Sequence, residues 1–142
     1  MSERFLDWQL RLEACLAERW SRAFAWAQQD CALFAADCVL ACTGIDPAMD
    51  VRGRYWDARS AQRLIQRLGG LAAICDARLG PRITPTLAQP GDVGLLSNDG
   101  HTCLGVCSGA GWLGPGALGV AVLPGDAACL AWRLTTEVAC HR

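Results

Sequence analysis

An acidic residue followed directly by a cysteine, Asp30-Cys31, is the pair in this sequence with the clearest chemistry. Asp30 is a typical helix N-cap, and the Ala- and Leu-rich stretch Cys31–Thr43 that follows ends at Gly44, a common C-terminal stop. Backbone N–H groups and the dipole at a helix start favour the thiolate, which is the nucleophilic form of cysteine. The sequence therefore predicts Cys31 as a nucleophile, with an inert buried thiol as the alternative.

A cysteine nucleophile needs a base, and the chain has two histidines, His101 and His141. His141 lies at the end of the sequence, whereas His101 follows an Asn-Asp-Gly turn and opens a predicted strand. The period of two places His101 on the same strand face as Cys103 and Gly105, from which it could point at the start of the helix. His101 is therefore the candidate base, with a solvated turn histidine as the alternative.

The other cysteines are weaker candidates for catalysis or metal binding. Cys38 and Cys42 share the predicted helix with Cys31, and we expect both to be buried as small apolar side chains. The nine cysteines include no Cys-x-x-Cys pair, which disfavours a zinc ribbon or a thioredoxin motif. We therefore expect no cofactor and no metal; zinc held by Cys38, Cys42, Cys103 or Cys107 is the alternative.

The elements that must position these residues predict one α+β domain over residues 1–142, with N-terminal helices packed on a C-terminal antiparallel sheet. Apolar periodicity and capping residues predict four helices, over Arg4–Trp20, Cys31–Thr43, Asp57–Leu68 and Leu71–Leu79. Turn residues and apolar runs predict strands over Val93–Leu96, His101–Cys107, Leu118–Leu123 and Cys129–Leu134.

Charge and hydropathy exclude some partners. Thirteen basic and fourteen acidic residues give a formal net charge of −1, which provides no electrostatic reason to expect a nucleic acid or an anionic membrane. The longest uncharged run, Gly100–Gly125, is broken by glycines and two prolines, so it does not predict a membrane-spanning helix. The first residues lack the apolar run of a secretory signal, and we expect free thiols in a reducing cytoplasm.

Two further groups of side chains suggest recognition. Arg54 and Tyr55, together with Asp30, are candidate substrate-binding residues, because guanidinium groups suit carboxylates. The alternative is a structural loop over residues 52–55 in which Tyr55 packs and the arginines pair with Asp46, Asp50 or Asp57. Tryptophans anchor cores or interfaces, and an exposed subset would favour protein docking: Trp8, Trp20, Trp26, Trp56, Trp112 and Trp132.

Several of these segments together resemble a known family. They are Asp30-Cys31-Ala-Leu-Phe-Ala-Ala-Asp37, then Pro90-Gly91-Asp92-Val93, then Cys103-Leu-Gly-Val-Cys-Ser-Gly. The sequence resembles the NlpC-type cell-wall peptidases of the papain-like superfamily. Through Thr43-Gly44-Ile-Asp46-Pro47 and the arginines that follow, it more narrowly resembles a group encoded by bacteriophages, prophages and phage-like gene-transfer particles, whose genes tend to lie among tail genes.

The resemblance implies a nucleophilic cysteine on a helix packed against an antiparallel sheet, a histidine at a strand start and a third polar residue on the next strand. Cys31 matches the nucleophile and Asp30 the acid before it. The family's histidine position is held here by Cys103, and His101 lies two residues earlier, about 6 to 7 Å along the strand. The third position falls within residues 111–115, which offer no side chain that could orient an imidazole.

Two functions follow from the resemblance. The first is a tail-associated cysteine hydrolase, a peptidase or amidase that cuts peptidoglycan peptides, with Cys31 as nucleophile, His101 as base and backbone N–H groups as oxyanion donors. The alternative is a catalytically degenerate structural component of the tail tip that docks other tail proteins. Either function implies a place in the virion tail, or in the host cytoplasm during assembly.

Overall fold

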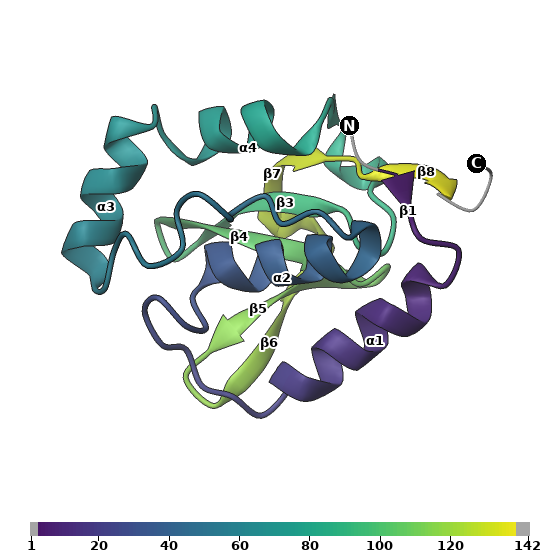
Figure 1. Cartoon of the computed structure of the whole chain (residues 1–142), viewed down its shortest axis with the longest axis horizontal. Helices are drawn as coiled ribbons and strands as arrows, with labels where there is room; N and C mark the ends of the chain where they lie inside the picture. The colour runs from purple at the N-terminus through teal and green to yellow at the C-terminus, as the bar shows by residue number, and fades with distance from the viewer. Residues whose placement is uncertain (1–2, 139–142) are drawn as a thin grey trace.

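Helices precede the main sheet along the chain, as the α+β prediction requires (Figure 1). The computed structural model describes residues 3–138. The four helices are α1 (Trp8–Arg19), α2 (Cys31–Thr43), α3 (Ala58–Arg67) and α4 (Leu71–Leu79). The strands are β1 (Glu3–Arg4), β2 (Arg82–Ile83), β3 (Val93–Asn98), β4 (His101–Cys107), β5 (Gly111–Gly116), β6 (Gly119–Pro124), β7 (Ala128–Trp132) and β8 (Thr135–Val138).

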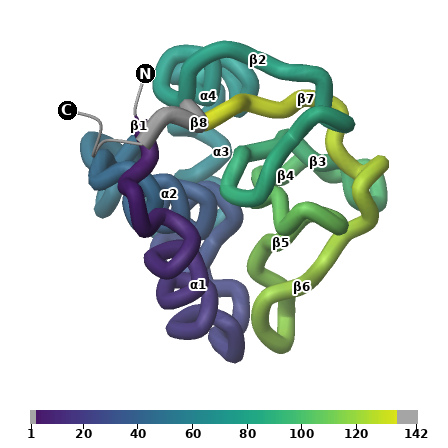
Figure 2. The backbone as a smooth tube through the Cα atoms, turned by 90° about the vertical axis from the view of Figure 1, so that its right-hand side faces the viewer, coloured from purple at the N-terminus to yellow at the C-terminus, as the bar shows by residue number. Residues whose placement is uncertain are grey.

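Six strands form one antiparallel sheet in the order β2-β7-β3-β4-β5-β6, and β1 pairs with β8 in a separate parallel ribbon. Figure 2 shows α1 and α2 together on one side of the sheet. The main core lies between α2 and the sheet, where Phe34 and Cys38 pack with Leu104 and Val106 of β4. No helix within residues 3–138 is both long and apolar enough to cross a membrane.

Helix α2 has the bounds that its capping residues predict. Asp30 accepts a hydrogen bond from the Leu33 N–H at 2.9 Å, which satisfies one of the helix's unpaired donors. Gly44 ends the helix with a φ of +79°, and its N–H donates to Leu40 O at 2.8 Å. Cys38 and Cys42 are both fully buried, which confirms their prediction as small core residues.

The start of the chain corrects the predicted helix Arg4–Trp20. Residues 3 and 4 form strand β1, and α1 begins only at Trp8. The Arg4 side chain is buried, and Arg4 Nη2 forms an ion pair with Asp92 Oδ1 at 2.9 Å. This partner lies 88 residues away along the chain. The apolar periodicity extends into this segment, but tertiary partners, strand β8 and Asp92, hold it in an extended conformation.

Strand β5 has no counterpart among the predicted strands. It is rich in glycine and contains a proline, both of which weaken a strand signal. Glycine is required at Gly111, where a Cβ would lie 2.4 Å from the carbonyl oxygen of Leu123 on β6. Close approach of two strands therefore explains the composition. The hairpin of β3 and β4 and the helices α3 and α4 lie where the sequence predicts them.

The ion pair of Arg4 and Asp92 ties the first strand to the sheet. Arg4 Nη1 also donates to Pro90 O at 2.7 Å, and the Asp92 carboxylate accepts from the N–H groups of Gln89 at 2.9 Å and Leu134 at 3.0 Å. Both side chains are about 2 % exposed or less. A buried ion pair of this kind is costly to break, because the remaining partner stays charged and desolvated.

We predict that Arg4→Met lowers the free energy of unfolding by about 3–5 kcal/mol, because the Asp92 carboxylate is left buried without its cation. Urea denaturation of both proteins measures the change. Arg22→Met is the matched control, since Arg22 pairs with Glu18 through side chains that are both more than half exposed. A loss for Arg4→Met as small as that of Arg22→Met would contradict the role of this pair.

Candidate functional site

The Asp30 carboxylate organises the chain around Cys31. It is 1 % exposed and accepts three hydrogen bonds, from the N–H groups of Ala27 and Leu33, each at 2.9 Å, and from the Tyr55 hydroxyl. The three donors come from the loop before α2, from α2 itself and from the loop before α3. The position of Cys31, the first residue of α2, is therefore fixed on three sides.

Asp30 and Tyr55 are structural partners. Tyr55 is 7 % exposed and packs with Leu33 and Leu64. Burial and the hydrogen bond to Asp30 raise the pKa of Tyr55, so its hydroxyl stays a donor to the carboxylate. The Asp30 carboxylate and the Tyr55 hydroxyl therefore bind each other, and both residues also border the cavity beside Cys31. Their role in substrate binding stays a prediction.

The arginines of residues 52–55 follow the structural alternative. Arg52 pairs with Asp37 at 2.6 Å and with Asp46 at 2.8 Å. Arg54 is exposed, and its guanidinium reaches the backbone oxygen of Asp50 at 3.4 Å. Neither arginine lines the cavity beside Cys31. The structure thus separates Arg54 from the site to which the sequence assigned it.

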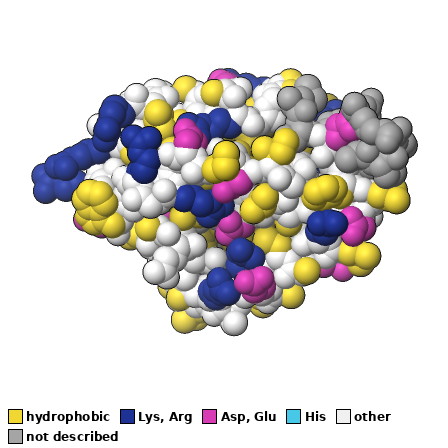
Figure 3. All heavy atoms as spheres, viewed as in Figure 1, with side chains coloured by type: hydrophobic (Ala, Val, Ile, Leu, Met, Phe, Trp, Pro, Cys, Tyr) yellow, Lys and Arg dark blue, Asp and Glu magenta, His cyan; other side chains and the backbone are white. Residues whose placement is uncertain are grey.

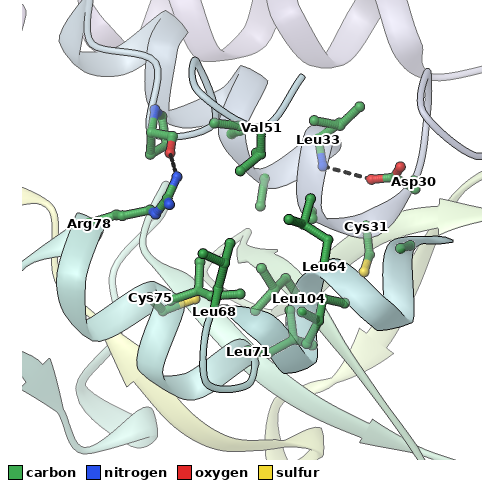
Figure 4. A pocket seen from close by; sticks show the side chains of 18 of the residues that line it. Asp30, Cys31, Leu33, Val51, Leu64, Leu68, Leu71, Cys75, Arg78 and Leu104 are labelled. Carbon is green, nitrogen blue, oxygen red and sulfur yellow. Dashed lines mark hydrogen bonds between the residues drawn. The ribbon is translucent and has the colours of Figure 1, made fainter. Parts of the chain in front are cut away.

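A cavity of about 510 Å³ lies beside Cys31. Its walls come from α2, α3, α4 and the facing strands, and Thr102 and Leu104 contribute from β4. Figure 4 shows Cys31 and Arg78 on opposite sides of this cavity, with leucine side chains between them. Thr102, Cys75 and Arg78 are cavity residues that the sequence analysis missed, because nothing in the local pattern places α3 and α4 over this face of the sheet.

The Cys31 thiol is protonated at neutral pH. Burial raises the pKa of Cys31 to about 11, and the charges of Cys103 and Asp30 act in the same direction, while a hydrogen bond with the Leu104 backbone opposes them. The sequence predicted the opposite shift, from the position of Cys31 at a helix start. The helix terminus contributes about 0.3–1 kcal/mol, whereas a pKa of about 11 disfavours the thiolate by about 3 kcal/mol relative to an ordinary thiol. Desolvation is therefore the larger effect.

His101 lies on the other face of β4 from Cys31. Thr102 and Leu104 point toward the cavity, whereas Cys103 packs against the core on the opposite face of the sheet. His101 shares the face of Cys103 by strand alternation, and it is exposed and absent from the cavity wall. The candidate base is thus not brought to the candidate nucleophile. His141 lies outside the described residues.

The position at which the resemblance implies a third polar residue lies in strand β5. There Trp112 and Leu113 are buried in the core, and Trp112 Nε1 donates to Gly125 O at 3.1 Å. This strand carries no side chain that could orient an imidazole. Strand β5 therefore offers no third polar residue for a catalytic histidine, as the sequence indicates.

The cysteines named in the zinc alternative lie on both sides of the sheet. Cys38 and Cys42 belong to the core beneath α2, while Cys103 and Cys107 contact the core on the opposite face. Within residues 3–138, no group of three or more His, Cys, Asp or Glu side chains is placed to hold a metal ion.

These features define an α+β protein with an apolar cavity beside a protonated thiol. The profile of a family described as a domain of unknown function (DUF6950) matches residues 3–134. The chain belongs to this family. No curated protein matches the sequence.

We predict that Tyr55→Phe lowers the free energy of unfolding by about 1.5–3 kcal/mol, because the buried Asp30 carboxylate loses one of its donors. Denaturant unfolding measures the loss. In an Asp30→Ala background the same substitution should cost much less. Equal costs in the two backgrounds would show that the hydroxyl does not act through Asp30.

The raised pKa of the Cys31 thiol leads to a second prediction. At pH 8, iodoacetamide should alkylate Cys31 about two hundredfold more slowly than it alkylates free cysteine, since the thiolate forms only as the pH rises through about 11. Peptide mass spectrometry over pH 7–11 gives the profile of each thiol. An inflection for Cys31 at or below pH 8 would contradict the protonated state and restore it as a nucleophile.

Proposed function

We propose that this chain is a catalytically degenerate member of the NlpC-type, papain-like superfamily. In this proposal it serves as a structural component of a bacteriophage or prophage tail and docks other tail proteins. It acts in the virion tail, or in the host cytoplasm while the tail is assembled.

The placement of Cys31 supports the papain-like assignment. A cysteine opens a helix that packs on an antiparallel sheet, as the resemblance implies, and the residue before it caps the helix. This arrangement is the one that nucleophilic cysteines use. The chain retains the frame of such a site.

The observation that supports a loss of catalysis is the position of His101 on the opposite face of β4 from Cys31, and the raised pKa of the Cys31 thiol agrees with it. Attack on an amide carbonyl requires a thiolate and a base near 3 Å from the thiol. A base behind the sheet cannot remove the proton from Cys31. The geometry therefore supports a scaffold better than a hydrolase.

Exposed aromatic side chains support the docking role. Trp56 is 71 % exposed, and the rings of Phe24 and Trp26 meet edge to face at 4.9 Å on the surface. In contrast, Trp112 and Trp132 are fully buried. Tryptophans left on a surface are typical anchors of protein interfaces.

A cysteine hydrolase of peptidoglycan peptides is the second candidate, and one observation favours it. Cys31 lies at a helix N-terminus and also lines a cavity, so a substrate could reach its sulfur. Backbone N–H groups of the first turn would then face a developing oxyanion.

We predict that the purified protein releases no soluble fragments from peptidoglycan and that Cys31→Ala behaves identically. Chromatography of the digested cell wall measures the release. Cys129→Ala is the control, because Cys129 is an exposed thiol outside the cavity. Fragment release that Cys31→Ala abolishes and Cys129→Ala preserves would overturn the scaffold proposal in favour of the hydrolase.

A further inference from the structure

The cavity beside Cys31 has the size of a ligand-binding site. Its volume of about 510 Å³ falls within the range of roughly 300–1,000 Å³ that is usual for small-molecule pockets. Helix α2 forms one wall, α3 and α4 form a second, and strands β3 and β4 form a third. A docking scaffold does not need an internal space of this size.

The walls favour hydrocarbon over a polar ligand. Leu64 of α3, Leu68 at the C-cap of that helix, Leu71 of α4 and Leu104 of β4 project between the helices and the sheet (Figure 4). A peptide backbone placed there would leave N–H and C=O groups without partners, which is costly in a buried site. An alkyl chain has no such groups to satisfy.

The two thiols of the walls are uncharged at neutral pH. Burial raises the pKa of Cys75 to about 12, and that of Cys31 to about 11. Asp30 also borders the cavity, but its carboxylate is already bound by three donors. The thiols therefore carry no charge, and the Asp30 carboxylate is stabilised by its three donors, so none of these groups requires a polar ligand in the cavity.

One end of the cavity carries a cation. Arg78 lines the wall, donates to Pro47 O at 3.0 Å and holds the Asp50 carboxylate through both terminal nitrogens. The Asp50 side chain is 64 % exposed, so this end of the cavity reaches solvent. A guanidinium at this boundary suits the carboxylate of an incoming ligand, which would take the place of the exposed Asp50 carboxylate and form the same paired hydrogen bonds.

Figure 3 shows arginines gathered at the α3 end of the face seen in Figure 1, and arginines mixed with acidic and apolar side chains over its middle. The formal net charge is only −1, so the selection of a ligand is assigned to the cavity and its rim.

We propose that this cavity binds a carboxylate with a single alkyl chain, the chain lying between α2, α3, α4 and β4 and the carboxylate at Arg78. This binding requires neither catalysis by Cys31 nor a place in a phage tail, so it stands apart from the proposed function.

Calorimetric titration with decanoate at pH 8 tests the site. The full chain should bind one decanoate saturably, with a negative heat-capacity change from burial of the alkyl chain, whereas acetate should not bind. Ala32→Leu and Ala72→Leu, which place extra carbons in the cavity, should each weaken binding by at least about tenfold. Ala17→Leu is the matched control on the exposed side of α1 and should bind as the original chain does.

Two comparisons locate the ends of the ligand. Decanoate should slow the alkylation of Cys31 at pH 10 and leave that of Cys129 unchanged. Arg78→Gln should weaken the binding of decanoate and leave the binding of decanol unaltered.

The proposal is overturned if decanoate shows no saturable binding, or if Ala32→Leu and Ala72→Leu bind it as tightly as Ala17→Leu does. Equal losses of decanoate and decanol binding in Arg78→Gln would overturn the placement of the carboxylate. None of these outcomes depends on cell-wall hydrolysis, so the failure of this proposal is distinct from that of the proposed function.

Discussion

The buried carboxylate of Asp30 is the interaction on which the candidate site depends. A desolvated charge is stable only when its oxygens accept hydrogen bonds. Here the donors are two backbone N–H groups, from Ala27 and Leu33, and the hydroxyl of Tyr55. One side chain thus starts helix α2, closes the loop before it and holds the loop that leads to α3. The position of Cys31 follows from the three hydrogen bonds that hold the neighbouring Asp30.

The enclosure that fixes Cys31 also determines its chemistry. Packing against Leu104 and the apolar walls removes water from the thiol. The resulting destabilisation of the thiolate is larger than the stabilisation that a helix N-terminus provides. A nucleophile in such a place would need a base on the same side of the sheet. The described chain has its one histidine, His101, on the other side, so it places no imidazole beside Cys31 to accept the proton of the thiol.

Much of the fold could be predicted because its signals are local. Asp30 and Gly44 bound α2, Asp57 caps α3, and the Asn-Asp-Gly turn joins β3 and β4. The failures all involve distant partners. Strand β1 pairs with β8 at the other end of the chain and its Arg4 pairs with Asp92, while β5 is recognised only once β6 lies beside it. A local pattern contains no information about a partner 88 residues away.

The candidate site was also predictable only where its signals are local. The sequence by itself determined that Asp30 caps a helix, that Cys31 opens it, and that His101 shares a strand face with Cys103. Only the tertiary structure decided which face of β4 meets α2. Because β4 is buried on both faces from Leu104 onward, with Leu104 on one side and Cys107 on the other, that part of its pattern is apolar on both faces and gives no direction. The packing of α2 on Leu104 and Val106 made that choice, and it turned His101 away from Cys31.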